Sequence, residues 1–295
     1  MTKVLGIVGS RRRLSNSDVL VREAINRVRE EGLETQIVYL DQFRLEECKG
    51  CLSCVFKGKC ALNDDLEKIL SLMLSAQGLI VGAPTYLFSP PGTIKILGDR
   101  GLNLSSYLDN LKTQPRYGIA ISISGDRRWN PMGVEFLTQF CWIYGFRVID
   151  YLEAYGPGPG EVALDEANLA GARAIAHRLV QALAGNPSKR PAAPNQCPVC
   201  YSRNFRINEN GCVVCPICLN QGHMVMVNGQ PQIEFQKDPP SISDHFWSWD
   251  YRIHHLHEWV IPTRDRYLKL RPAIKEKLKK YRIEIINAPR TQHSN

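Results

Sequence analysis

The first 184 residues alternate short apolar runs with longer segments in which apolar residues recur every three or four positions. The short runs are continuous, which is typical of strands buried on both faces of a parallel sheet. We place these strands at residues 4–9, 35–40, 78–83, 117–123 and 147–154. The periodic segments predict helices that begin near Asn16, near Asp64, after Pro91, after Pro131 and near Asp165. Because strands and helices alternate, the pattern predicts an α/β fold.

The alternation stops at Gly185, and the rest of the chain has a different organisation. Residues 185–196 are rich in proline and lack apolar periodicity, so we interpret them as a linker after a domain at 1–184. Residues 197–236 read as a small cysteine-bearing β domain with a hairpin turn at 208–211. Residues 237–295 read as an aromatic and basic helical tail.

The composition supports a folded protein that acts in water. Of 295 residues, 44% are hydrophobic and 22% are charged. The longest apolar stretches fall far short of the roughly 20 residues that a membrane span needs. The chain begins directly with a strand-like segment, without the features of a secretory signal, so we expect a cytoplasmic protein.

The positive charge lies mainly in the C-terminal third. Residues 1–184 carry 21 basic and 20 acidic side chains, whereas residues 185–295 carry 16 and 9. This excess is modest, so we rank nucleic acid last among the partners considered.

A polar loop at residues 9–17 connects the first predicted strand to the first helix. Hydroxyl groups and free backbone N–H groups at a helix N-terminus favour an anion. The loop lacks the G-x-G-x-x-G spacing of dinucleotide sites, so a terminal phosphate monoester fits it better. The alternative is an ordinary helix cap beside solvated arginines.

An aromatic, proline-rich loop at residues 84–91 follows the third strand. In a doubly wound sheet of order 2-1-3-4-5, strands 1 and 3 flank the switch point where ligands bind. The two loops then share one crevice, which indicates a ligand with a phosphate at one end and a flat ring at the other. Plain packing of the aromatic residues is the alternative.

Three segments, at residues 10–17, 84–89 and 95–100, together resemble the flavodoxin-like, NADPH-dependent FMN reductase family over residues 3–184. The resemblance implies a flavodoxin-like, doubly wound sheet of five parallel strands in the order 2-1-3-4-5. It also implies FMN, with the phosphate on Ser10, Arg12, Ser15, Asn16 and Ser17. The ring and ribityl chain would lie on Pro84, Thr85, Tyr86, Leu87, Phe88 and Ser89, assisted by Ser124, Gly125 and Asp126. A homodimer or homotetramer is the oligomeric state that the resemblance implies.

Four cysteines lie close together after the second predicted strand. Their spacing is C-x2-C-x2-C-x5-C, formed by Cys48, Cys51, Cys54 and Cys60. Thiols on one loop can converge on the corners of a [4Fe-4S] cluster, and a structural zinc ion is the alternative. The spacing is similar to that of the iron-sulfur flavoproteins, a branch of the same family. Because the loop follows a parallel strand, it emerges at the same sheet edge as both flavin loops.

A second cysteine set has the spacing of a mononuclear metal site. Cys197 and Cys200 form one C-P-x-C knuckle, and Cys215 and Cys218 form another fourteen residues later. This pattern predicts a zinc ribbon, and a rubredoxin-like iron uses the same ligands. Cys212 lies on the strand that enters the second knuckle, and we treat it as a spare thiol.

The leading hypothesis is a redox flavoprotein with FMN and a [4Fe-4S] cluster. It would relay electrons between a reduced donor, ferredoxin or NAD(P)H, and an acceptor, with the reactivity supplied by the cofactors rather than by an acid or base side chain. One alternative is a simple NAD(P)H-dependent flavin or quinone reductase with zinc at the 48–60 cysteines. A second alternative is a redox-sensing flavoprotein that binds nucleic acid.

Overall fold

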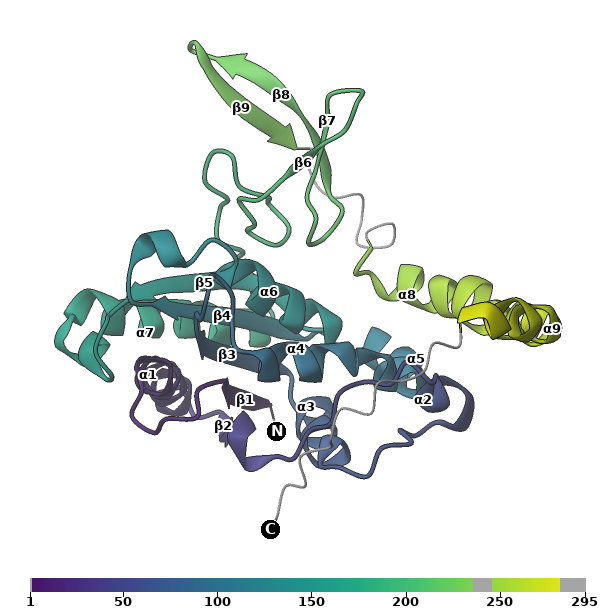
Figure 1. Cartoon of the computed structure of the whole chain (residues 1–295). Helices are drawn as coiled ribbons and strands as arrows, with labels where there is room; N and C mark the ends of the chain where they lie inside the picture. Colours follow the sequence, from purple (N-terminus) through teal and green to yellow (C-terminus); the bar gives the residue numbers. More distant parts are fainter. Residues whose placement is uncertain (1, 236–245, 282–295) are drawn as a thin grey trace. The chain divides into compact units, whose positions relative to one another are not determined.

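A computed structural model describes residues 2–235 and 246–281 of the chain. Its central element is a parallel sheet of five strands in the order β2-β1-β3-β4-β5, which confirms the predicted order (Figure 1). The observed strand ends differ from the predicted ones by at most one residue. The strands are β1 (Lys3–Val8), β2 (Glu34–Tyr39), β3 (Gly78–Pro84), β4 (Tyr117–Ser124) and β5 (Arg147–Tyr155).

Helices cover both faces of the sheet. The helices α1 (Asn16–Glu30) and α7 (Glu166–Leu183) pack against each other and bury one face through side chains such as Val21, Ile25 and Leu179. The other face carries α3 (Leu66–Ser75), α4 (Gly92–Asp99) and α6 (Gly133–Ile143). The apolar periodicity of these segments explains this arrangement, since each helix turns its apolar stripe to the sheet.

Two helical segments were missed by the sequence analysis. One is α2 (Ser53–Lys57), inside the cysteine loop, and the other covers residues 101–112 as a 3-10 helix (Gly101–Tyr107) and α5 (Leu108–Lys112). Both are short and lack a full apolar repeat, so pattern analysis had too few residues to detect them. Further 3-10 turns lie at Leu40–Gln42, Arg127–Trp129 and Glu161–Leu164.

A second, antiparallel sheet follows the segment 185–196. It has the order β6-β7-β8-β9 and contains the predicted hairpin at 208–211. Its strands are β6 (Arg206–Ile207), β7 (Cys212–Val214), β8 (Gln221–Val227) and β9 (Gln230–Phe235). The segment before it is not free, because Arg190 N donates to Ile149 O of β5 at 2.9 Å.

The tail is helical, as expected, in the residues that the structure describes. It contains α8 (Trp249–His255), a π-helical turn (Leu256–Val260), α9 (Ile261–Leu278) and a 3-10 turn (Lys279–Tyr281). By contacts the chain divides into compact units at 1–252 and 253–295. The predicted boundaries at residues 184 and 196 stay predictions. The boundary at 236 and the tail residues 237–245 and 282–295 lie outside the described residues. No helix within 2–235 or 246–281 is long and apolar enough to cross a bilayer.

Candidate functional site

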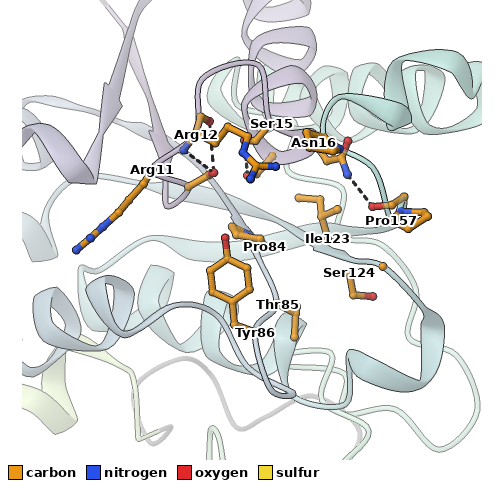
Figure 2. Close-up of a pocket in the computed structure, with 15 residues that line it drawn as sticks. Arg11, Arg12, Ser15, Asn16, Pro84, Thr85, Tyr86, Ile123, Ser124 and Pro157 are labelled. Carbon is orange, nitrogen blue, oxygen red and sulfur yellow. Dashed lines mark hydrogen bonds between the residues drawn. The ribbon is translucent and has the colours of Figure 1, made fainter.

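A cavity of about 450 Å³ opens at the carboxyl edge of the parallel sheet, between the loops that follow β1, β3, β4 and β5 (Figure 2). The structure brings most of the residues predicted for FMN to this cavity. Those that line it are Ser10, Arg12, Ser15, Asn16, Ser17, Pro84, Thr85, Tyr86, Ser124 and Gly125. The other predicted residues, Leu87, Phe88, Ser89 and Asp126, belong to the same loops but do not line it.

One end of the cavity is formed by the N-terminus of α1. Ser15 is the N-cap residue, and its side chain accepts a hydrogen bond from Asp18 N at 3.3 Å. The Ser10 hydroxyl accepts a hydrogen bond from Arg12 N at 3.1 Å, and Ser17 is buried (Figure 2). These contacts hold the loop in place before any ligand arrives. Helix N–H groups and hydroxyls therefore form a preorganised site for an anion.

This end of the cavity is positively charged. The buried carboxylate close to it, Asp18, is already paired and does not offset the arginines. Asp18 accepts hydrogen bonds from Arg22 Nε at 2.7 Å and from the Tyr39 hydroxyl at 2.9 Å. Burial, assisted by the Asp18 carboxylate, raises the pKa of Tyr39, so Tyr39 stays neutral. Arg13 pairs with Asp41 at 3.1 Å, whereas Arg12 lines the cavity. Among the described residues that line the cavity there is no carboxylate, so an anion here meets N–H groups and a guanidinium.

The sequence analysis missed one wall of the cavity. Gly156, Pro157 and Pro159, in the loop after β5, line it together with Arg11 and Ile123. The Asn16 amide holds this wall, since its Nδ2 donates to Gly156 O at 2.8 Å (Figure 2) and to Gly158 O at 3.0 Å. A signal was present in the repeated Gly-Pro of residues 156–160, directly after a parallel strand.

The other end of the cavity is formed by residues 84–86, and Tyr86 begins a tight turn after β3. Tyr86 N donates to Ser89 O at 2.8 Å, and Ser89 N donates back to Tyr86 O at 3.3 Å. The turn forces Leu87 and Phe88 into the left-handed region, at φ 48° and 76°. Phe88 stacks on Trp129 at 5.1 Å between ring centroids. The turn therefore presents exposed aromatic surface beside the cavity.

A polar network fixes the base of this turn to the neighbouring strand. The Thr85 hydroxyl donates to Asn130 Oδ1 at 2.8 Å, and the Ser122 hydroxyl donates to the same oxygen at 2.8 Å. Thr85 N also donates to Ile123 O of β4 at 2.7 Å. The 84–86 segment at this end of the cavity thus lies on a rigid base rather than on a free loop.

In the FMN-free protein, replacing Leu87 by asparagine is expected to raise the free energy of unfolding. A left-handed backbone costs a leucine about 1–2 kcal/mol, whereas asparagine adopts it readily. Leu87 is 79% exposed, so little packing is lost. We expect a gain of about 1 kcal/mol, or ~2–4 °C in the Tm followed by circular dichroism. The control is Leu164→Asn, an equally exposed leucine outside the left-handed region. An unchanged or lower Tm for Leu87→Asn would contradict the expectation.

The four cysteines after β2 line one small hollow of about 30 Å³. They are Cys48, Cys51, Cys54 and Cys60. Left-handed residues at Gly50, Leu52 and Gly58 fold the loop back on itself. Burial raises the pKa of Cys54, and the neighbouring Cys60 and Cys48 add to this increase. A bound cation would offset that increase, because it stabilises the thiolate.

The four knuckle cysteines of the second sheet lie much closer together. The sulfurs of Cys197, Cys200, Cys215 and Cys218 all lie within 4.8 Å of one another, and all four residues are buried. The Cys197 and Cys218 sulfurs are 3.5 Å apart, and those of Cys200 and Cys215 are 3.4 Å apart. Cys212 is outside this set and half-buried. Four thiols at these distances have the geometry of tetrahedral ligands to one ion.

The cysteine knuckles pack on the edge of the parallel sheet. The Tyr201 hydroxyl donates to Ile149 O of β5 at 2.6 Å. The carboxylate of Glu135, on α6, accepts hydrogen bonds from Arg203 N at 3.1 Å and Asn204 Nδ2 at 2.9 Å. Burial raises the pKa of Glu135. A folded knuckle therefore stays attached to the parallel sheet through buried polar contacts.

Comparisons with known proteins identify the family of the chain. Residues 2–155 match the family described as NADPH-dependent FMN reductase. An iron-sulfur flavoprotein of Methanocaldococcus jannaschii is 32% identical over 190 residues, which cover 61% of this chain and 96% of that protein. An iron-sulfur flavoprotein of Methanosarcina thermophila is 33% identical over 148 residues, or 50% of this chain and 76% of that protein.

A solved structure named flavone reductase shows the same fold along almost the whole chain. It covers 96% of this chain and 98% of its own, with a TM-score of 0.72 and 19% identity. The family match spans just over half of this chain, and the Methanocaldococcus protein is matched along nearly its full length. The chain therefore belongs to the NADPH-dependent FMN reductase family, in its iron-sulfur flavoprotein branch, and is a flavin-dependent oxidoreductase.

Proposed function

We propose that this protein holds FMN in the carboxyl-edge cavity and a [4Fe-4S] cluster at the 48–60 cysteines, and relays electrons between a reduced donor and an acceptor. The observation that carries the proposal is the position of α4. This helix begins directly after the 84–91 loop and is followed at once by Arg100, whose guanidinium donates to Cys60 Sγ at 3.0 Å. Eight residues of α-helix are ~12 Å long, so one rigid element links the two sites at short range.

The cavity fits a flavin mononucleotide at both ends. Ser10, Ser15, Ser17, Arg12 and the N–H groups at the start of α1 would hold the phosphate. The Asn16 side chain is occupied by the loop after β5, so Asn16 would contribute through its backbone N–H. The ring would lie against the 84–86 segment and the loop after β4. When bound, FMN exchanges either one or two electrons, and an iron-sulfur cluster exchanges one at a time.

The spacing of the thiols favours a cluster over zinc at residues 48–60. A single zinc ion with bonds of about 2.3 Å draws its four sulfurs to within ~4 Å of one another. The knuckle cysteines have this spacing, whereas among the described residues the 48–60 cysteines do not form a group that could hold a single ion in this way. A [4Fe-4S] cluster takes one thiolate per iron and so needs ligands farther apart. We assign zinc to the knuckle set, where a rubredoxin-type iron would use the same ligands.

The electron donor we propose is ferredoxin or NAD(P)H. A ferredoxin delivers single electrons, which suits entry at the cysteine loop, where Cys48 and Cys51 are exposed. NAD(P)H delivers a hydride, which requires access to the flavin cavity. Rapid mixing of the oxidised protein with each donor would separate the two, since only the productive donor bleaches the flavin absorbance. A homodimer or homotetramer and a cytoplasmic location are part of the same proposal.

The deciding experiment is a cofactor assay on protein purified without oxygen. Iron, acid-labile sulfide, zinc and FMN are measured on one sample, together with the visible spectrum. The proposal expects about four irons, four sulfides, one zinc and one FMN per chain. Two zinc ions with FMN and no sulfide would overturn the cluster and leave a simple flavin or quinone reductase. A fifth iron per chain, with no zinc and no sulfide beyond the four of the cluster, would identify a rubredoxin-type knuckle.

Replacing Ser15 by aspartate is expected to abolish FMN binding while the helix stays intact. Aspartate is as good an N-cap as serine, so the hydrogen bond to Asp18 N is kept. Its carboxylate, however, would face the phosphate, and such like-charge contacts cost several kcal/mol. We expect at least ~100-fold weaker binding in a titration of the protein without FMN. The control is Ser15→Asn, a neutral cap of nearly the same shape. Equal FMN affinity in both variants would contradict the assignment of the phosphate site.

A further inference from the structure

A fully buried guanidinium lies behind the cysteine loop. Arg100 is 1% exposed and follows the last residue of α4. Its Nη2 donates to Cys60 Sγ at 3.0 Å, and its Nη1 donates to Asp64 Oδ2 at 2.7 Å and to Glu46 O at 2.6 Å. One side chain therefore ties both ends of the cysteine loop and one of its four thiols to α4.

The charges around Arg100 favour a negative sulfur. A guanidinium stays protonated in proteins, so Nη2 is a charge-assisted donor to Cys60. Its buried counterion is Asp64, which also accepts hydrogen bonds from Glu46 N at 2.8 Å and from Leu66 N at 3.2 Å. These backbone donors share the Asp64 charge. Asp64 therefore neutralises the Arg100 charge less completely, and more of that charge acts on the Cys60 sulfur.

One N–H donor of Arg100 is unpaired. Within the part of the chain that the structure describes, its buried Nε has no hydrogen-bond partner. A buried N–H without an acceptor costs about 1–3 kcal/mol, so such groups are rarely left unpaired. A bound cluster brings further sulfur acceptors to this hollow. A cluster sulfur in this hollow would give the unpaired Nε an acceptor.

We propose that Arg100 raises the reduction potential of the cluster held by the 48–60 cysteines, as a positioning and charge-setting residue rather than a ligand. This inference rests on the proposed function. Reduction adds one electron, taken from the reduced donor, to the cluster and makes it more negative. Hydrogen bonds to the sulfurs and nearby positive charge stabilise the reduced form more than the oxidised form. Loss of Arg100 then lowers the potential, and loss of the Asp64 charge raises it.

The test is an anaerobic redox titration of the complete protein, in which the cluster is followed by its electron paramagnetic resonance signal. Arg100→Gln is expected to lower the equilibrium constant for reduction about tenfold, which corresponds to ~59 mV for one electron. Arg100→Lys keeps the charge but not the forked donors, so its potential is expected to lie between those of Arg100→Gln and the wild type. Asp64→Asn is expected to shift the potential in the opposite direction. Iron, sulfide and FMN are measured on every sample.

The matched control is Lys95→Gln. Lys95 is on the same helix and pairs with Asp99, but it is exposed, so solvent screens its charge and the potential is expected to stay at the wild-type value. Unchanged potentials in Arg100→Gln and Asp64→Asn would overturn the inference. Loss of iron from all three buried-site variants would also overturn it, because Arg100 would then be an assembly residue. Absence of iron and sulfide from the wild type would instead overturn the proposed function.

Discussion

Replacing Cys51 by alanine is expected to remove the iron and the acid-labile sulfide while FMN stays bound. Cys51 is exposed, so the substitution removes a ligand without opening a cavity in the core. A [4Fe-4S] cluster that loses one of its four thiolates leaves one iron without a protein ligand. The FMN cavity is formed by other loops, and none of the 48–60 cysteines lines it. The measurement is the iron, sulfide and FMN content per chain, together with the visible spectrum.

The control for this substitution is Cys212→Ala. Cys212 is a half-buried thiol outside both cysteine sets, so it is expected to keep every cofactor at the wild-type level. Full iron content in Cys51→Ala would show that Cys51 is not a ligand. Loss of FMN together with iron would show that the cysteine loop is needed for the fold. It would contradict the expectation that the two sites bind their cofactors independently.

Replacing Cys215 by alanine is expected to release the zinc and unfold the knuckle domain, residues 197–235. Binding of structural zinc by such peptides is worth about 10–16 kcal/mol, which is folding energy for a domain with a small apolar core. The four thiols are all buried, and the buried apolar side chains beside them are few, namely Val199, Tyr201, Val213 and Ile217. We expect rapid proteolysis within 197–235, a lower Tm and a near-normal FMN spectrum. Zinc analysis and limited proteolysis followed by mass spectrometry provide the test.

Cys212 could replace Cys215 as a ligand in this variant. It lies three residues before Cys215, on β7, and is the only other thiol of the described knuckle domain. If it replaces Cys215 as a ligand, the single variant keeps its zinc and its protease resistance. The double variant Cys212→Ala, Cys215→Ala removes this route. A double variant with full zinc content and an intact knuckle would contradict the assignment of the site.

The parallel sheet was predictable because short segments of the sequence are enough to identify its strands and helices. Each strand is largely an apolar run, and several major helices begin at a polar or proline residue, as at Ser15, Pro91 and Asp165. Burial on both faces leaves such runs no other stable arrangement than the centre of an α/β sheet. The parallel strands in turn bring their carboxyl-end loops to one edge. The placement of the 9–17 and 84–91 loops at one sheet edge therefore followed from the sequence.

Several parts of the site were decided only by the tertiary structure. The Asn16 amide contacts the loop after β5, about 140 residues away, and Arg100 contacts Cys60, 40 residues before it. Spacing along the chain cannot show such contacts, because they exist only once the sheet and α4 bring distant segments together. The spacing of the cysteines predicted two metal-binding sets, and only the folded structure showed that the four knuckle thiols lie within 4.8 Å of one another. Sequence thus determined which ligands are present, and the packing of distant segments determined their separation and the charge beside them.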